Sequence, residues 1–128
     1  MDNLKTLFDL AIKARKNAHA PYSKFKVGAA ILSAENHFYS GANVENVSYP
    51  LGNCAEASAI ADMVKNGDKK IKEILVVSAG KHLITPCGGC LQRIEEFATP
   101  KTIIHLADLQ GVKKSYKLQE LLPIAFRE

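Results

Sequence analysis

The sequence lacks three things that would place it in common classes of protein. It has no apolar run near the roughly 20 residues of a membrane-spanning helix, and Met1 to Lys5 lead straight into an amphipathic pattern without the apolar core of a signal peptide. Its three cysteines are an odd number, which argues against a closed disulfide framework. We therefore expect a cytoplasmic protein with no membrane partner, whose cysteines bind a metal or act in catalysis.

The positive charge of the chain is also not concentrated in any one segment. The net charge of +4 comes mostly from lysines spread along the chain, with small clusters at Lys69-Lys70 and Lys113-Lys114. A nucleic-acid-binding protein would show a basic stripe with interleaved aromatic residues, and we find none. The pattern favours a solvated lysine-rich surface and no nucleic-acid partner. The length of 128 residues predicts a single domain over residues 1–128.

Hydrophobic periodicity predicts helices alternating with strands. Leu4, Leu7, Phe8 and Ala11 recur at helical spacing, and the Ile-Leu-Val-Val run 74–77 is apolar on both faces, as in a buried strand. Such alternation favours an α/β fold with helices on both faces of one sheet. The expected helices are 4–19, 54–65, one opening at 87–90 and continuing through 91–97 before Pro100, and 119–122; the expected strands are 22–32, 37–44, 73–79, 102–107 and 112–117.

Two short motifs hold all the cysteines. Cys54-Ala55-Glu56 and Pro86-Cys87-Gly88-Gly89-Cys90 each stand where a helix is expected to begin. Backbone N–H groups and the helix dipole favour thiolates at such positions. Three thiolates are one ligand short of a tetrahedron, and an open fourth position distinguishes catalytic from structural zinc. Glu56 can face that position without being a ligand, which indicates hydrolytic chemistry with a carboxylate that shuttles protons.

Other interpretations of the cysteines remain open. Cys87 and Cys90 at a strand-to-helix turn are also typical of a thiol–disulfide oxidoreductase, although that leaves the first motif unexplained. A structural zinc module needs a fourth ligand, for which His82 is the nearest candidate. A zinc-stabilised binding protein without turnover would have little use for Glu56, because a buried uncoordinated carboxylate is costly.

The sequence resembles the cytidine deaminases of the small, free-nucleoside type that have a three-cysteine zinc site. The resemblance covers almost the whole chain. Besides the two cysteine motifs it is carried by segments 22–30, 41–46, 49–52 and 120–123, together with Phe126. It implies a three-layer α/β/α sandwich with a central mixed sheet of about five strands, and a homotetramer with shared active sites.

The resemblance also implies an activity: zinc-dependent hydrolytic deamination of cytidine and 2′-deoxycytidine in pyrimidine salvage, with one Zn²⁺ per subunit. Cys54, Cys87 and Cys90 would be the zinc ligands, and Glu56 would be catalytic. Deamination of a modified or antibiotic nucleoside would keep the same metal motif, and deamination within nucleic acid is disfavoured by the missing basic stripe. The residues implied in substrate binding are Phe25, Asn43, Glu45, Ala55, and, approaching a neighbouring subunit's pocket, Tyr49 and Phe126.

The sequence departs from this family at two positions beside the metal motif. Many three-cysteine relatives carry arginine directly after the glutamate and after the last cysteine, where this chain has Ala57 and Leu91. Zinc with three thiolates carries a net charge of about −1, and arginine hydrogen bonds to the sulfurs would relieve it. Without them the two helix N-termini must compensate more of the charge, unless another cation reaches the sulfurs.

Overall fold

The computed structural model describes residues 2–128, and its elements follow the predicted order. Asp2 caps the first helix by accepting hydrogen bonds from the backbone N–H groups of Leu4 and Lys5. No helix among these residues is long and apolar enough to cross a membrane. The elements are α1 (Asn3–Lys16), β1 (Val27–Ser33), β2 (Phe38–Ala42), a short 3₁₀ helix η1 (Tyr49–Leu51), α2 (Ala55–Lys65), β3 (Ile71–Ser78), α3 (Gly88–Glu96), β4 (Ala98–Asp108), β5 (Gly111–Lys117) and α4 (Leu118–Leu121).

The five strands form one mixed sheet in the order β2-β1-β3-β4-β5. Only β3 and β4 pair in parallel, and the other three neighbouring pairs are antiparallel. A parallel pair needs a crossover connection, and α3 supplies it. The mixed five-stranded sheet implied by the resemblance is therefore confirmed.

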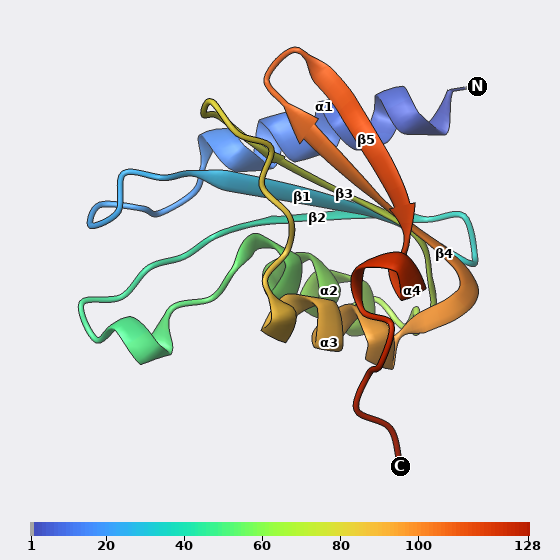
Figure 1. Ribbon diagram of the computed structural model, residues 1–128. Helices are drawn as coiled ribbons and strands as arrows, with labels where there is room; N and C mark the ends of the chain where they lie inside the picture. The colour runs from blue at the N-terminus through green and yellow to red at the C-terminus, as the bar shows by residue number, and fades with distance from the viewer. Residues whose placement is uncertain (1) are drawn as a thin grey trace.

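Helices cover both faces of the sheet (Figure 1). Because side chains alternate between faces along a strand, β1 and β3 contribute to two separate cores. One core packs α1 on the sheet through Leu7 and Ala11; the other packs α2 and α3 through residues such as Met63 and Ile94. These layers are the expected α/β/α sandwich.

Two glycines allow helices to approach the sheet closely. A Cβ atom at Gly28 on β1 would lie 2.0 Å from the carbonyl oxygen of Ala11 in α1. A Cβ atom at Gly41 on β2 would lie 2.4 Å from the backbone nitrogen of Ala59 in α2. Any larger residue would push the helix away, so glycine at these positions sets the spacing of both layers.

The N-terminal boundaries differ from the prediction. The helix expected over 4–19 ends at Lys16, and the strand expected from Tyr22 begins only at Val27. Instead, the backbone N–H groups of Tyr22 and Ser23 both donate to the carboxylate of Glu45. A distant side chain therefore takes the donors that a longer strand would use.

The position of Pro100 was also predicted incorrectly as a boundary between elements. Helix α3 ends at Glu96, and β4 begins at Ala98, so Pro100 lies inside a strand. The pairing of β3 with β4 shifts between Ile71 and Glu73, where the partner residues jump from Ala98 to Ile103. Proline is tolerated in such an irregular stretch because the regular ladder does not need its missing N–H.

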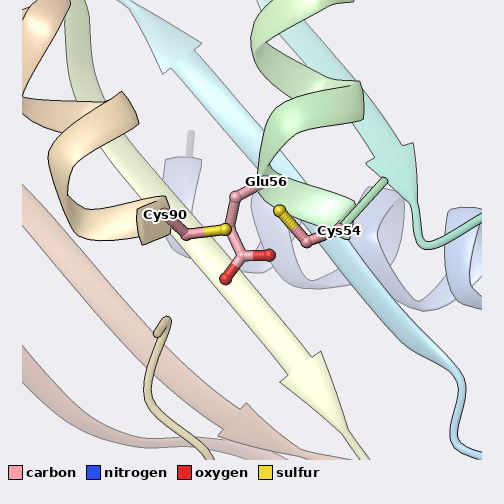
Figure 2. Close-up of side chains that lie close together, drawn as sticks. All are labelled: Cys54, Glu56 and Cys90. Atoms are coloured by element: carbon pink, nitrogen blue, oxygen red, sulfur yellow. The ribbon is translucent and has the colours of Figure 1, made fainter. Parts of the chain in front are cut away.

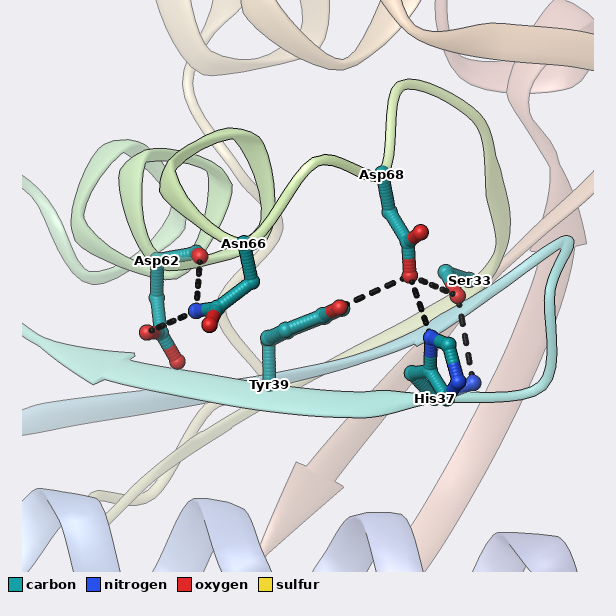
Figure 3. Close-up of polar contacts among 6 residues, drawn as sticks. All are labelled: Ser33, His37, Tyr39, Asp62, Asn66 and Asp68. Atoms are coloured by element: carbon teal, nitrogen blue, oxygen red, sulfur yellow. Dashed lines mark hydrogen bonds and ion pairs between the residues drawn. The ribbon is translucent and has the colours of Figure 1, made fainter.

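The buried carboxylate of Asp68, in the α2–β3 connection, is hydrogen-bonded to side chains of the β1–β2 hairpin (Figure 3). Asp68 Oδ2 accepts hydrogen bonds from Ser33 Oγ at 2.8 Å and Tyr39 Oη at 2.7 Å, and contacts His37 Nδ1 at 2.9 Å. The bond to Asp68 raises the pKa of Tyr39 to about 12. The sequence analysis gave His37 no role, and this network is its structural environment.

Candidate metal centre and substrate cavity

The two cysteine motifs lie at helix N-termini, as the sequence predicts. Cys54 is the residue before the first turn of α2, and Cys87 stands in the same position before α3. Cys90 follows in the first turn of α3. Figure 2 shows the side chains of Cys54, Glu56 and Cys90 pointing toward one another from these two helices.

Three possible metal-binding atoms converge between the helices. The Sγ atoms of Cys54 and Cys90 and a carboxylate oxygen of Glu56 all lie within 4.8 Å of one another. Cys90 and Glu56 are buried and Cys54 is half-buried. Cys87 is exposed and stands outside this group. Soft thiolates beside a carboxylate suit zinc better than magnesium or calcium, so the donor set fits a zinc ion.

A cavity of about 360 Å³ opens onto this group, a volume in the range of small-molecule sites. Its lining includes eight of the ten residues that the sequence analysis assigned to the site, Cys87 among them. Those eight are Asn43, Glu45, Tyr49, Cys54, Ala55, Glu56, Cys87 and Cys90. Segments far apart in the sequence therefore meet around one cavity.

The loop that carries Asn43 and Glu45 is held by these same side chains. Asn43 Oδ1 accepts from the backbone N–H of Val27, and its Nδ2 donates to the carbonyl of Phe25, both at 2.9 Å. Glu45 Oε1 accepts from the Tyr22 and Ser23 backbones at 3.0 and 3.1 Å, and its Oε2 accepts from the Ser23 hydroxyl. These bonds lower the pKa of Glu45, the Ser23 hydroxyl bond being the largest cause.

Two residues assigned to substrate binding do not line the cavity. Phe25 lies beside it through its carbonyl bond to Asn43, and its ring is partly exposed. Phe126 is 79% exposed on the C-terminal tail, where its backbone exchanges two hydrogen bonds with the side chain of Gln92. Tyr49 lines the cavity but is 74% exposed. The roles of Phe25 and Phe126 stay predictions.

The site perturbs the acidity of its own groups. Burial raises the pKa of Glu56 to about 7, and the neighbouring Cys54 thiolate contributes to this rise. A hydrogen bond with Cys90 lowers the pKa of Cys54 to about 6, and the same contact raises the pKa of Cys90. The backbone N–H of Ala57, at the N-terminus of α2, also favours the Cys54 thiolate.

The sequence analysis left open whether a cation reaches the sulfurs and did not identify which residue supplies it. Arg93 Nη1 lies 3.6 Å from Cys90 Sγ and 3.8 Å from Cys54 Sγ. The charge of Cys54 holds the pKa of Arg93 above its usual range. Its sequence signal was the spacing from Cys90, because residues three apart share one face of a helix. Of the two possibilities that the sequence left open, the structure therefore shows the second: a cation reaches the sulfurs in addition to the helix N-termini.

Other residues of the cavity carried no sequence signal. Val76 on β3 and the loop residues Ile84 and Thr85 also line it. His82, the candidate fourth ligand of a structural zinc module, is exposed and neither lines the cavity nor belongs to the group of possible ligands.

Comparisons with known proteins agree with this geometry. The model of a family described as the cytidine and deoxycytidylate deaminase zinc-binding region matches residues 1–106. The chain is 42% identical over 116 residues to a cytidine deaminase of Halalkalibacterium halodurans, covering 91% of this chain and 88% of that protein. It is 40% identical over 114 residues to one from Sporosarcina psychrophila, covering 89% and 84%.

The fold is also similar to solved structures. A cytidine deaminase from Burkholderia pseudomallei superposes with a TM-score of 0.91 at 38% identity, covering 98% of this chain and all of that one. One from Mycobacterium tuberculosis gives a TM-score of 0.84 at 31% identity, with both chains fully covered. These likenesses do not favour a thiol–disulfide oxidoreductase.

Proposed function

Because the chain belongs to the cytidine and deoxycytidylate deaminase family, we propose that it hydrolyses cytidine and 2′-deoxycytidine to uridine and 2′-deoxyuridine with release of ammonia. This hydrolase would act on the C–N bond of a cyclic amidine, in pyrimidine salvage. The observation that carries the proposal is the convergence of Cys54, Cys90 and the buried Glu56 on one small cavity.

The proposed metal ligands are the three cysteines. Cys54 and Cys90 face each other across the helix N-termini, and Cys87 borders the same cavity from the start of α3. When bound, zinc lowers the pKa of a water molecule so that it becomes a nucleophile near neutral pH. The cysteines supply soft, charged donors, and the helix N-termini stabilise them as thiolates.

Glu56 is the proposed proton carrier. Its carboxylate takes a proton from the attacking water, passes it to N3 of the pyrimidine and later delivers a proton to the amino group leaving C4. Burial raises its pKa to about 7, and a group with a pKa near the working pH both accepts and donates protons efficiently. One water is consumed and one ammonia is released per turnover.

Asn43 and Glu45 are proposed to bind the ribose 3′-hydroxyl. The carboxylate of Glu45 has about four acceptor positions, and three are used by Tyr22 and Ser23. One acceptor therefore remains for a hydroxyl group. The amide of Asn43 likewise keeps one N–H and one lone pair beyond its two backbone bonds.

The base is proposed to lie between Phe25 and the α2 N-terminus. The Ala55 backbone borders the cavity and would contact the base edge, and the Phe25 ring would close over its face. Aromatic packing of this kind excludes water from a reacting ring.

We also propose a homotetramer with shared sites. Tyr49 and Phe126, the residues assigned to a neighbouring pocket, are both largely exposed, and exposed apolar side chains often mark interfaces. The same loop and tail expose further large apolar side chains: Val47, Leu51 and Ile124.

We further propose a cytoplasmic location, because three free cysteines agree with a reducing compartment.

The deciding experiment measures ammonia release from cytidine and from 2′-deoxycytidine by purified protein, with zinc determined on the same sample. We expect turnover with one zinc per chain. One zinc without turnover on either nucleoside would refute the substrate assignment. Absence of zinc, together with a reversible disulfide between Cys87 and Cys90, would refute the reaction class.

A further inference from the structure

The guanidinium of Arg93 lies against the sulfur pair. Its Nη1 approaches Cys90 Sγ to 3.6 Å and Cys54 Sγ to 3.8 Å, which brings one donor to cysteines from two different helices. Within residues 2–128 the guanidinium makes no ion pair with a carboxylate. The sulfurs are therefore the anionic groups toward which this side chain is directed.

The third cysteine lies nearby on the same side. A Cβ atom at Gly89 would lie 3.7 Å from Arg93 Nη1 and 3.8 Å from Cys87 Sγ. The guanidinium thus passes over the first turn of α3, close to the stretch between Cys87 and Cys90.

The electrostatic need for a cation follows from the ligand set. A divalent ion held by three thiolates leaves a net charge of about −1, concentrated on sulfurs that lie partly inside the protein. Hydrogen bonds from a cation to ligating sulfurs spread this charge and fix the ligand geometry. No lysine and no other arginine among residues 2–128 donates a hydrogen bond to a cysteine sulfur.

We propose that Arg93 is a positioning residue of the metal centre, whose contacts with Cys54 and Cys90 offset the thiolate charge and set how firmly the three cysteines retain zinc. The inference rests on the zinc site of the proposed function. It extends that function by assigning the retention of the metal to a side chain that does not itself bind it.

The test compares variants of the zinc-loaded protein. Arg93→Met keeps most of the aliphatic stem and removes the charge, and Arg93→Lys keeps a charge with different geometry. Arg127→Ala is the matched control, because Arg127 also contacts α3, through Glu95, but lies away from the sulfurs. The readout is the rate at which a coloured chelator extracts zinc, with the unfolding midpoint measured on each variant.

We expect Arg93→Met to lose zinc about 10–100-fold faster than wild type, the usual cost of removing a partner of a metal ligand. Arg93→Lys should recover part of this loss, and Arg127→Ala should match wild type. The arginine is largely exposed, so about 1 M salt should narrow the difference between wild type and Arg93→Met. Wild-type extraction rates in a folded Arg93→Met protein would overturn the proposal.

A relocated charge provides a second, independent test. The backbone of Ala57 already faces the Cys54 sulfur, so an arginine side chain at position 57 starts close to it. Ala57→Arg combined with Arg93→Met should therefore restore slow zinc release; equally fast release from the double and single variants would contradict a charge effect.

The readout also separates this inference from the proposed function. A protein that binds zinc but does not turn over cytidine would refute only the substrate assignment, and the zinc-extraction test would still apply. A wild-type protein that binds no zinc would overturn both.

Discussion

Because β2 and α2 lie in close contact at Gly41, a substitution at this position is expected to move α2 and the site residues that it carries. A Cβ atom at Gly41 would lie 2.4 Å from the Ala59 nitrogen and 2.7 Å from the carbonyl carbon of Ser58. Both neighbours are backbone atoms of α2, the helix that carries Glu56 and begins after Cys54. A side chain at this position therefore acts directly on the placement of the helix.

The size of the effect of Gly41→Ala follows from these distances. To reach even a tight Cβ contact of about 3.0–3.4 Å, helix and strand must separate by roughly 0.6–1 Å. Overpacking of this kind costs about 1–3 kcal/mol, which for a chain of this length lowers the melting temperature by roughly 3–15 °C. A displacement near 1 Å in a catalytic group can reduce the rate by about 10²-fold.

A matched variant separates loss of stability from displacement of the site. Gly28→Ala creates a contact of 2.0 Å with the Ala11 carbonyl, but it pushes α1, which carries no proposed site residue. Thermal unfolding and kcat for cytidine are measured for both variants in zinc-containing buffer. We expect both proteins to melt lower, and only Gly41→Ala to lose turnover strongly.

Two results would refute this reasoning. An unchanged melting temperature for Gly41→Ala would mean that the contact relaxes without cost. An equal loss of kcat in both variants would mean that reduced stability, rather than displacement of α2, lowers the activity.

Three further predictions concern single side chains. Glu56→Gln should keep zinc and fold but lose about 10²–10⁴ in kcat, the range of a general acid–base group; retained turnover would exclude it as the proton carrier. Glu45→Gln should reduce kcat/KM for cytidine by about 10–100-fold, because hydrogen bonds to a charged group contribute about 1.5–3 kcal/mol; an unchanged kcat/KM would remove Glu45 from ribose binding. Asp68→Asn should lower the urea midpoint near neutral pH, because the Tyr39 hydroxyl, followed by Ser33 and His37, lowers the pKa of Asp68 in the folded state. That stabilisation is present above the ordinary carboxyl pKa of 3.8 and is lost as pH falls through the folded value, so the difference between wild type and Asp68→Asn should shrink on acidification; a constant difference across this range would contradict the assignment.

Most of the fold was predictable because its signals are local. The order of helices and strands followed from apolar periodicity, and Cys54 and Cys87 were placed at helix N-termini correctly. The misplaced start of β1 has a non-local cause, since Glu45 binds the backbone of Tyr22 and Ser23 from more than 20 residues away. No window of sequence around Tyr22 contains that information.

The same distinction applies to the site. The convergence of Cys54, Glu56 and Cys90 was predictable from motif spacing, whereas Arg93 was not predicted because it is not adjacent to any of the proposed ligands in the sequence. Its i, i+3 relation to Cys90 was readable, but its reach to Cys54 depends on how α3 packs beside α2. The Asp68 network, which joins residues up to 35 positions apart, had no sequence signal at all.

The topology explains why the two motifs must meet. Helix α2 leads into the start of β3 and α3 follows its end, and both helices pack on the same face of the sheet. Helix α2 packs against β1 and β2 and lies beside α3, and the N-termini of the two helices bring Cys54 and Cys90 together (Figure 2). Two positive helix ends therefore face the same point at the carboxyl end of a buried strand. The helix ends offset only part of the negative charge of the three proposed thiolate ligands. In our proposal Arg93 offsets a further part of that charge from the solvent side, where a cation is added without the cost of burying it.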